Sequence, residues 1–304
     1  MKEDIGFESQ GAELTAWLFT PDTEPPWPVV VMGHGFSATR THMTADEYAE
    51  VLRTAGLAAL LYDHYGFGDS GGEPRLQVNA WMQARGYMDA ITYCSKRDGI
   101  DHARIALWGD SIAGAIAVAV AGIDTRVAAL VVQVPACGNE LSPADQDGSL
   151  YRSFKVTILS GAIVPSGDQV EGPMPVVSDD QVRRPSALKP LTAYRWFIEY
   201  GGRFGTNWVN DVTIARPDTP VGWHPGLAAK HVECPAMFVV SPKDEMPGAD
   251  PGVARDTFER IKGPKEWYEV AGGHFGLLYC PSPEFDDASQ AQARFLAEQL
   301  IHGE

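Results

Sequence analysis

A short apolar segment that turns sharply into a helix of small residues places the strongest constraint on this chain. Residues 105–108 read as a buried strand, Gly109-Asp-Ser as a tight turn, and residues 112–122 as a helix rich in Ala and Val. A strand, turn and helix with a serine at the apex is typical of a nucleophile elbow, whose strained backbone lifts the serine hydroxyl clear of the sheet. The usual last glycine of G-x-S-x-G is Ala113 here, which is small enough to keep the turn. An ordinary helix N-cap serine is the alternative for Ser111 taken alone.

The rest of the chain alternates apolar strands with helices, which predicts an α/β fold with a mostly parallel sheet covered on both faces. An N-terminal hairpin is expected over residues 5–8 and 14–19. Further strands are expected at 29–32, 57–62, 128–134, 236–240 and 266–270, and helices at 44–55, 79–95, 251–261 and 286–301. Ligands of such sheets bind outside the carboxyl ends of the strands. The residues that follow each strand should therefore meet in one crevice.

The alternation stops between residues 138 and 231, where prolines recur. We expect residues 1–137 and 232–304 to form one core and residues 138–231 to fold as an inserted cap, because a structureless loop of this length is improbable in a compact domain. One helix is predicted inside it, Ala187 to Tyr200, carrying Tyr194, Trp196 and Phe197.

The composition of the chain argues against several classes of partner and cofactor. The net charge of −16 argues against a nucleic-acid surface, which needs clustered Lys and Arg, and disfavours anionic membranes. The four cysteines are scattered and the N-terminus has no apolar signal region, so we expect reduced thiols in a cytoplasmic protein. The longest apolar run, residues 112–123, is too short to span a bilayer. No cluster has zinc-ligand spacing, so we expect neither a metal nor a cofactor.

Three strand ends offer a serine, an acid and a histidine in that order: Ser111, Asp244 and His274. A serine hydroxyl is a weak nucleophile near pH 7, and needs a base to take its proton and a carboxylate to orient that base. Glu245, and more remotely Asp211, compete with Asp244 for the role of the acid. Asp110, next to Ser111, is not expected to be the nucleophile, because the apex of the elbow is Ser111.

Four motifs together, Gly109-Asp-Ser-Ile-Ala-Gly, Asp63-His-Tyr-Gly-Phe-Gly-Asp-Ser, His34-Gly-Phe and Gly273-His-Phe, resemble the α/β-hydrolase superfamily. The chain is most similar to dienelactone-hydrolase-like serine hydrolases and carboxylesterases, over residues 4–137 and 232–302. The resemblance implies that Ser111 attacks an acyl carbon, that His274 is the general base and acid, and that Asp244 orients the imidazole. It implies an oxyanion hole made by the backbone N–H groups of Phe36 and Ile112.

The predicted activity is hydrolysis of a carboxylic ester of a small to medium, partly apolar molecule through an acyl-enzyme. An acyltransferase, thioesterase, amidase or carbon–carbon hydrolase with the same three residues is the alternative, and a non-catalytic small-molecule receptor is a third. His34, His64 and Trp196 are candidates for substrate contact. The expected partner is a small-molecule substrate rather than nucleic acid or membrane, and the sequence leaves a homodimer open.

Overall fold

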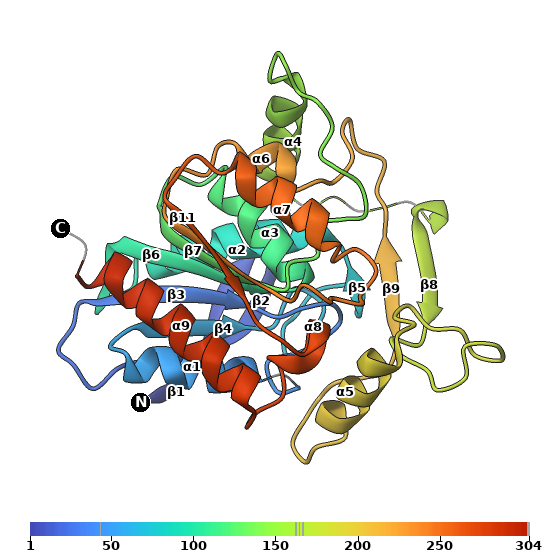
Figure 1. Ribbon diagram of the computed structural model, residues 1–304, viewed down its shortest axis with the longest axis horizontal. Helices are drawn as coiled ribbons and strands as arrows, with labels where there is room; N and C mark the ends of the chain where they lie inside the picture. The colour runs from blue at the N-terminus through green and yellow to red at the C-terminus, as the bar shows by residue number, and fades with distance from the viewer. Residues whose placement is uncertain (43, 162, 164, 166, 303–304) are drawn as a thin grey trace.

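The computed structural model describes residues 1–42, 44–161, 163, 165 and 167–302. Its centre is an eight-stranded sheet in the order β1-β2-β4-β3-β6-β7-β10-β11 (Figure 1). The β1–β2 and β2–β4 pairs are antiparallel and the remaining pairs are parallel. The strands are β1 Lys2–Ser9, β2 Ala12–Phe19, β3 Trp27–Gly33, β4 Ala58–Tyr62, β6 Ile100–Asp110, β7 Val127–Gln133, β10 Ala236–Val240 and β11 Lys265–Glu269. The predicted N-terminal hairpin and parallel sheet are therefore confirmed.

The buried stretches of the middle strands, such as residues 29–32, 58–62 and 236–240, are apolar because both faces of the sheet are covered. In β3, Val29 and Val31 belong to one hydrophobic cluster, whereas Val30 and Met32 belong to the cluster on the opposite face. Successive side chains of a strand point to opposite faces, so a continuous apolar run feeds two cores at once.

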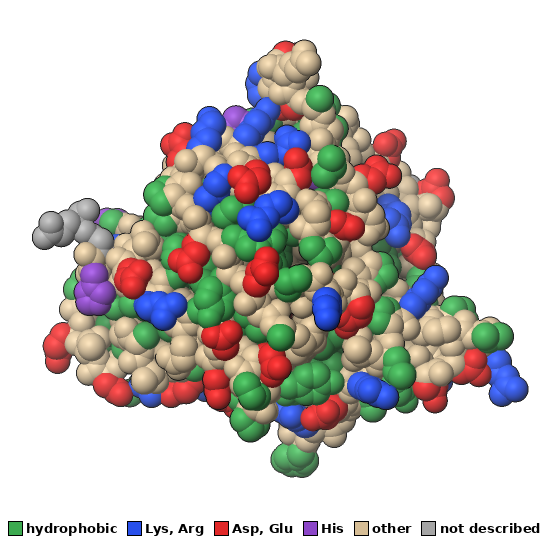
Figure 2. Space-filling model, in the orientation of Figure 1, with side chains coloured by type: hydrophobic (Ala, Val, Ile, Leu, Met, Phe, Trp, Pro, Cys, Tyr) green, Lys and Arg blue, Asp and Glu red, His purple; other side chains and the backbone are tan. Residues whose placement is uncertain are grey.

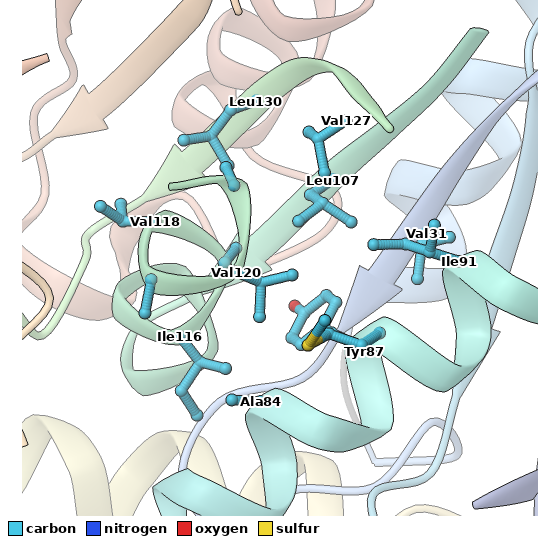
Figure 3. Packing of buried hydrophobic residues seen from close by; sticks show 14 of the residues in the cluster. Val31, Ala84, Tyr87, Ile91, Leu107, Ile116, Val118, Val120, Val127 and Leu130 are labelled. Carbon is cyan, nitrogen blue, oxygen red and sulfur yellow. The ribbon is translucent and has the colours of Figure 1, made fainter. Parts of the chain in front are cut away.

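Helices cover each face (Figure 1). On one face lie α1 Ala45–Thr54 and α9 Pro283–Leu300, and on the other lie α2 Ala80–Cys94, α3 Ile112–Ala121 and α7 Pro251–Arg260. Figure 3 shows how α2 and α3 pack on the sheet through residues such as Tyr87, Ile91, Ile116 and Val120. The side chains of Asn79, Asp250 and Ser282 cap the N-termini of α2, α7 and α9.

Residues 138–231 contain more regular structure than the sequence suggests. They form α4 Ser149–Leu159, the 3₁₀ turn η1 Gly167–Gln169, β8 Val170–Met174, α5 Leu191–Gly201, β9 Val212–Ala215 and α6 Gly226–Ala229. The strands β8 and β9 make a small sheet with β5 Gln77–Val78, in the order β5-β9-β8. Residues 138–231, called the inserted segment below, are thus tied through this sheet to the short strand β5, which precedes α2, as Figure 1 shows at the right of the view.

The predicted helix over Ala187–Tyr200 begins too early. In the structure α5 starts at Leu191, with Pro190 as its N-cap residue. Proline cannot donate the backbone hydrogen bond of a helix interior, and it pushes the preceding residue out of the helical region. Leu188 instead forms a bridge with Val177.

Acidic and basic side chains are interspersed over the face shown in Figure 2, which also carries scattered apolar groups. Within the described residues, none of the helices is both long and apolar enough to cross a membrane.

Candidate active site

Ser111 occupies a strained turn between β6 and α3. Its φ of 54° and ψ of −118° lie outside the regions that non-glycine residues usually adopt, as a nucleophile elbow requires. Gly109 allows the end of β6 and the start of α3 to pack closely, because a Cβ at this position would clash with the carbonyl oxygen of Ala113, at 2.4 Å. The Ser111 carbonyl accepts hydrogen bonds from the N–H groups of Ala115 and Ala136, which fixes the turn to the helix and to the end of β7.

The structure brings Ser111, His274 and Asp244 together. The Nε2 atom of His274 lies 3.0 Å from Ser111 Oγ, and its Nδ1 atom lies 2.7 Å from Asp244 Oδ2. Asp244 Oδ1 accepts the N–H of Met246, which holds the carboxylate in place. A carboxylate only accepts hydrogen bonds, so Nδ1 carries the proton and Nε2 is free to accept the serine hydroxyl.

The two other acids considered from the sequence do not hydrogen-bond the imidazole ring of His274. Glu245 contacts the backbone of His274 rather than its ring, because its Oε2 accepts the His274 N–H at 2.9 Å. Its other oxygen accepts the hydroxyl of Thr192, in the first turn of α5. Asp211 hydrogen-bonds the N–H of its neighbour Val212, in the inserted segment. Glu245 therefore links the inserted segment to the loop that follows β11 and carries His274, called the histidine loop below. The sequence did not suggest this role.

Glycines shape this histidine loop. Gly272 and Gly273 have φ values of 98° and 72°, and His274 follows them within the short helix α8 Gly273–Gly276. A Cβ at Gly273 would lie 2.5 Å from Glu245 Oε2. The Gly-Gly pair therefore permits both the turn and the approach of the Glu245 carboxylate.

Phe36 and Ile112, the two proposed oxyanion donors, both line the cavity beside Ser111. Neither backbone N–H donates to a protein acceptor within the described part of the chain. Ile112 is the first residue of α3, where the backbone N–H groups carry partial positive charge. A developing oxyanion requires N–H donors that are free to bind it, and the assignment of that role to Phe36 and Ile112 stays a prediction.

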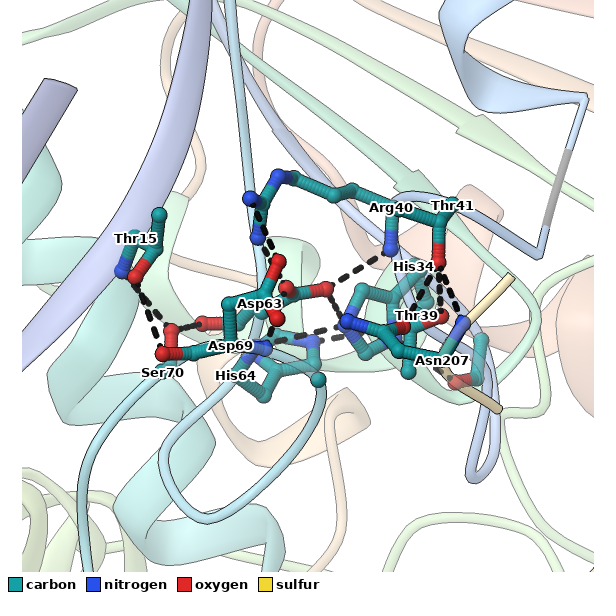
Figure 4. A network of polar contacts seen from close by, with 12 residues as sticks. Thr15, His34, Thr39, Arg40, Thr41, Asp63, His64, Asp69, Ser70 and Asn207 are labelled. Carbon is teal, nitrogen blue, oxygen red and sulfur yellow. Dashed lines mark hydrogen bonds and ion pairs between the residues drawn. The ribbon is translucent and has the colours of Figure 1, made fainter. Parts of the chain in front are cut away.

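A buried polar network fixes the loop that carries Phe36 (Figure 4). Asp63 is fully buried, pairs with the Arg40 guanidinium and accepts the Arg40 N–H at 2.7 Å. Arg40 also pairs with Asp69 at 2.8 Å. His34, expected as a substrate contact, is buried within this network, where its Nε2 accepts the His64 N–H at 3.2 Å. Neither His34 nor His64 lines the cavity, and both contribute to the loop structure.

The same loop is also held by the inserted segment. The ring of His42 stacks on Trp208 at a centroid distance of 4.9 Å and on Phe197 at 5.0 Å, and meets the edge of Trp196 at 4.8 Å. Burial in this aromatic cage lowers the pKa of His42 to about 3. Thr41 adds hydrogen bonds to Asn207. The loop of residues 34–42, called the oxyanion loop below after the role predicted for Phe36, is therefore packed against the inserted segment.

A cavity of about 260 Å³ opens beside Ser111 and is mostly apolar. The inserted segment supplies one wall: Ala187, Leu188, Trp196, Phe197, Ile214 and Trp223. Trp196 is thus part of the wall, although its indole N–H is used in a hydrogen bond of 3.1 Å to Leu278 O and its ring packs on Tyr200. An apolar cavity with a few convergent polar groups is typical of a small-molecule site.

Electrostatics favour a base at His274. Burial by itself lowers the pKa of this imidazole, but the hydrogen bond and charge of Asp244, together with Asp110 and Glu245, outweigh it and raise the pKa above its ordinary value. Burial also raises the pKa of Asp110 to about 6. Over the described residues, no group of three or more His, Cys, Asp or Glu side chains is placed to hold a metal ion.

Comparisons with known proteins agree with this architecture. The family model described as X-Pro dipeptidyl-peptidase (S15 family) matches residues 10–154. The thiohydrolase aneE of Aspergillus aculeatus is 29% identical over 90% of this chain and 86% of its own. The polyketide transferase grgF of Penicillium sp. is 28% identical over 91% of each chain.

The similarity extends to solved structures. The crystal structure of the α/β hydrolase GrgF from Penicillium sp. superposes with a TM-score of 0.74 at 26% identity, over 99% of both chains. Dienelactone hydrolase from Anabaena variabilis has the same fold, with a TM-score of 0.60 at 14% identity over 99% of this chain and 98% of that one. The sheet order, the strained serine and these similarities lead to one conclusion: the chain has the α/β-hydrolase fold.

Proposed function

We propose that this protein is a serine hydrolase that cleaves a carboxylic ester, or a related acyl bond, of a small to medium and partly apolar molecule. The observation that carries the proposal is the continuous contact from Asp244 through His274 to Ser111, with distances of 2.7 and 3.0 Å. Each of the three groups has the partner that it needs to turn a neutral hydroxyl into a nucleophile.

In the first half of the proposed reaction, Ser111 Oγ attacks the acyl carbon while His274 Nε2 takes its proton. Asp244 holds the Nδ1 proton and stabilises the imidazolium that forms. The N–H groups of Phe36 and Ile112 stabilise the negative charge on the former carbonyl oxygen, and losing one such donor typically costs about 3 kcal/mol of transition-state stabilisation.

The second half regenerates the serine. The imidazolium gives its proton to the leaving group, the tetrahedral species collapses and an acyl-enzyme remains. Water, activated by His274, then attacks the acyl carbon, and the proton returns to Ser111 when the acid product leaves. If an alcohol or another nucleophile enters in place of water, the same steps amount to acyl transfer.

We propose that residues 138–231 act as a cap and select the substrate, because they supply one wall of the cavity and pack against the oxyanion loop. Thioester cleavage and acyl transfer are the main alternatives to ester hydrolysis, since full-length relatives are named thiohydrolase and polyketide transferase. A cytoplasmic location is proposed from the four cysteines, which are all free thiols.

A matched substrate panel tests the proposal. One acyl group is offered as an ester, a thioester, an amide and a β-diketone, first with water alone and then with an added alcohol acceptor. Turnover of at least one of these bonds is expected for the wild type and not for Ser111→Ala, whose circular dichroism and unfolding midpoint should match the wild type. Equal turnover by the two proteins would contradict the proposal.

A further inference from the structure

The cavity beside Ser111 contains one carboxyl group that the reaction described above does not use. Asp110 lines the cavity and only 3% of it is exposed. Its Oδ1 accepts a hydrogen bond from Gln133, whereas its Oδ2 has no hydrogen-bond partner within the part of the chain that the structure describes. A ligand that fills the cavity would remove water from this oxygen, and a polar atom that loses water without gaining a partner costs free energy, so the carboxylate favours a ligand group that can pair with it.

A chain of hydrogen bonds holds Asp110 in one orientation. The indole N–H of Trp108 donates to Gln292 Oε1 at 2.7 Å, and Gln292 Nε2 donates to Gln133 Oε1 at 2.8 Å. Gln133 Nε2 then donates to Asp110 Oδ1 at 3.2 Å. An indole N–H can only donate, so the direction of every bond in this chain is fixed and ends on Asp110.

All four members of this chain are buried, and they come from β6, β7 and α9. Such networks rigidify a core when they are fully paired. Every side-chain oxygen of the two glutamines is paired in the chain, and Asp110 Oδ2 is left free at its end. The arrangement therefore presents one fixed acceptor to the cavity.

This acceptor lies next to the nucleophile. A Cβ placed on Gly35 would be 2.8 Å from Asp110 Oδ2 and 3.3 Å from Ser111 Cβ, so the carboxylate and the serine flank the same point of the oxyanion loop. A group that pairs with Oδ2 would then belong to the part of a substrate nearest the scissile carbonyl. Most of the neighbouring lining residues are apolar, and among the described residues that line the cavity Asp110 alone carries a carboxylate.

We propose that Asp110 is a specificity-determining residue that accepts a hydrogen bond from a hydroxyl group on the acyl chain, two or three carbons from the attachment to Ser111. The substrates would then be hydroxyacyl esters or thioesters with an otherwise apolar chain. This inference rests on the proposed hydrolase function and names the substrate class for the same site.

A hydroxyl fits this site better than an ammonium group. His274 becomes positively charged during the reaction, and a substrate cation beside Asp110 would oppose that charge at short range in a poorly hydrated cavity. A hydroxyl carries no charge, and a bond to a carboxylate is among the stronger hydrogen bonds that it can form. A purely apolar chain would instead leave the Asp110 oxygen desolvated and unpaired.

The test compares kcat/KM for p-nitrophenyl esters of butanoate, 2-hydroxybutanoate, 3-hydroxybutanoate and 3-aminobutanoate. Each rate is corrected for spontaneous hydrolysis. We expect the wild type to prefer one hydroxy ester over butanoate by roughly 10- to 100-fold, the range for a hydrogen bond to a charged group. Asp110→Leu should bring that ratio close to one, and Asp110→Asn, which keeps a polar group, should give an intermediate ratio.

Met246→Leu, which changes another cavity residue, serves as the matched control and should leave the ratio unchanged. A structural or purely electrostatic role of Asp110 would lower the rates of all the esters together and keep the ratio, which would overturn the inference. A wild-type preference for the amino ester, or none at all, would also overturn it. Labelling of Ser111 by a fluorophosphonate separates the two failures: a labelled serine with a ratio of one sinks this inference alone, whereas an unlabelled serine sinks the proposed function as well.

Discussion

Glu245 holds the backbone of His274 while its neighbour Asp244 holds the ring. The two carboxylates differ by one position, yet Asp244 Oδ2 lies 2.7 Å from His274 Nδ1 and Glu245 Oε2 accepts the His274 N–H at 2.9 Å. Replacing each acid by its amide therefore tests which of them takes part in the chemistry.

Asp244→Asn should lower kcat by about 10⁴, because an amide no longer stabilises the imidazolium or enforces the tautomer that accepts the serine proton. Glu245→Gln should lower it about tenfold or less, because the amide oxygen still accepts the His274 N–H. Steady-state kinetics on the best ester of the panel measure both effects. Equal losses in the two variants would show that the assignment of the acid is wrong.

The pH dependence of kcat/KM should show an acidic limb with a midpoint above pH 6.5. Only neutral His274 can take the serine proton, and the hydrogen bond and charge of Asp244 raise the pKa of this histidine despite its burial. Activity is therefore complete above that pKa and is lost as the pH falls through it. Asp110 also raises the pKa of His274, so Asp110→Asn should move the limb to lower pH. A limb that moves to higher pH in this variant would contradict the electrostatic account.

Arg40→Met should cost about 3–5 kcal/mol in the free energy of unfolding, since it leaves the fully buried Asp63 carboxylate without its ion partner. Arg53→Met is the matched control, because Arg53 pairs with the largely exposed Asp22 and the half-exposed Glu50, and should cost at most about 1 kcal/mol. Urea denaturation measures both. Costs of the same size would mean that the Arg40–Asp63 pair does not fix the oxyanion loop.

Gly109→Ala should reduce both stability and activity. The added Cβ would meet the Ala113 carbonyl at 2.4 Å, and only a movement of the strand or the helix can relieve a clash with backbone. Overpacking of this kind typically costs about 1–3 kcal/mol, and a shift of about 1 Å at the serine lowers the rate about 10²-fold. Gly222→Ala, at a site with no atom within 4 Å, should leave both properties close to the wild type. A fully active Gly109→Ala variant would argue against the close elbow packing.

The core was predictable because its signals are local. Continuous apolar runs such as β3 mark buried strands, and the residues after them lie at strand ends whatever the details of the packing. The meeting of Ser111, Asp244 and His274 followed from that rule. The inserted segment was less predictable, because β9 depends on pairing with β5, which is more than 130 residues away in the sequence.

The functions of individual polar residues were also hard to predict. His42 and Glu245 make contacts with the inserted segment that no local pattern announces. His34 looked exposed to substrate because it ends a strand, yet the buried Asp63 network encloses it. The orientation of the Asp110 carboxylate depends on a hydrogen-bond chain whose members are spread over 185 positions from Trp108 to Gln292.

The most direct test of the account is covalent labelling of the folded protein with a fluorophosphonate, followed by peptide mass spectrometry. We expect one adduct per chain, on the hydroxyl of Ser111, and a rate that falls by at least about 10²-fold in His274→Ala, because the base that activates the hydroxyl is gone. A folded wild-type protein that stays unlabelled at Ser111, or that reacts equally fast without His274, would contradict it.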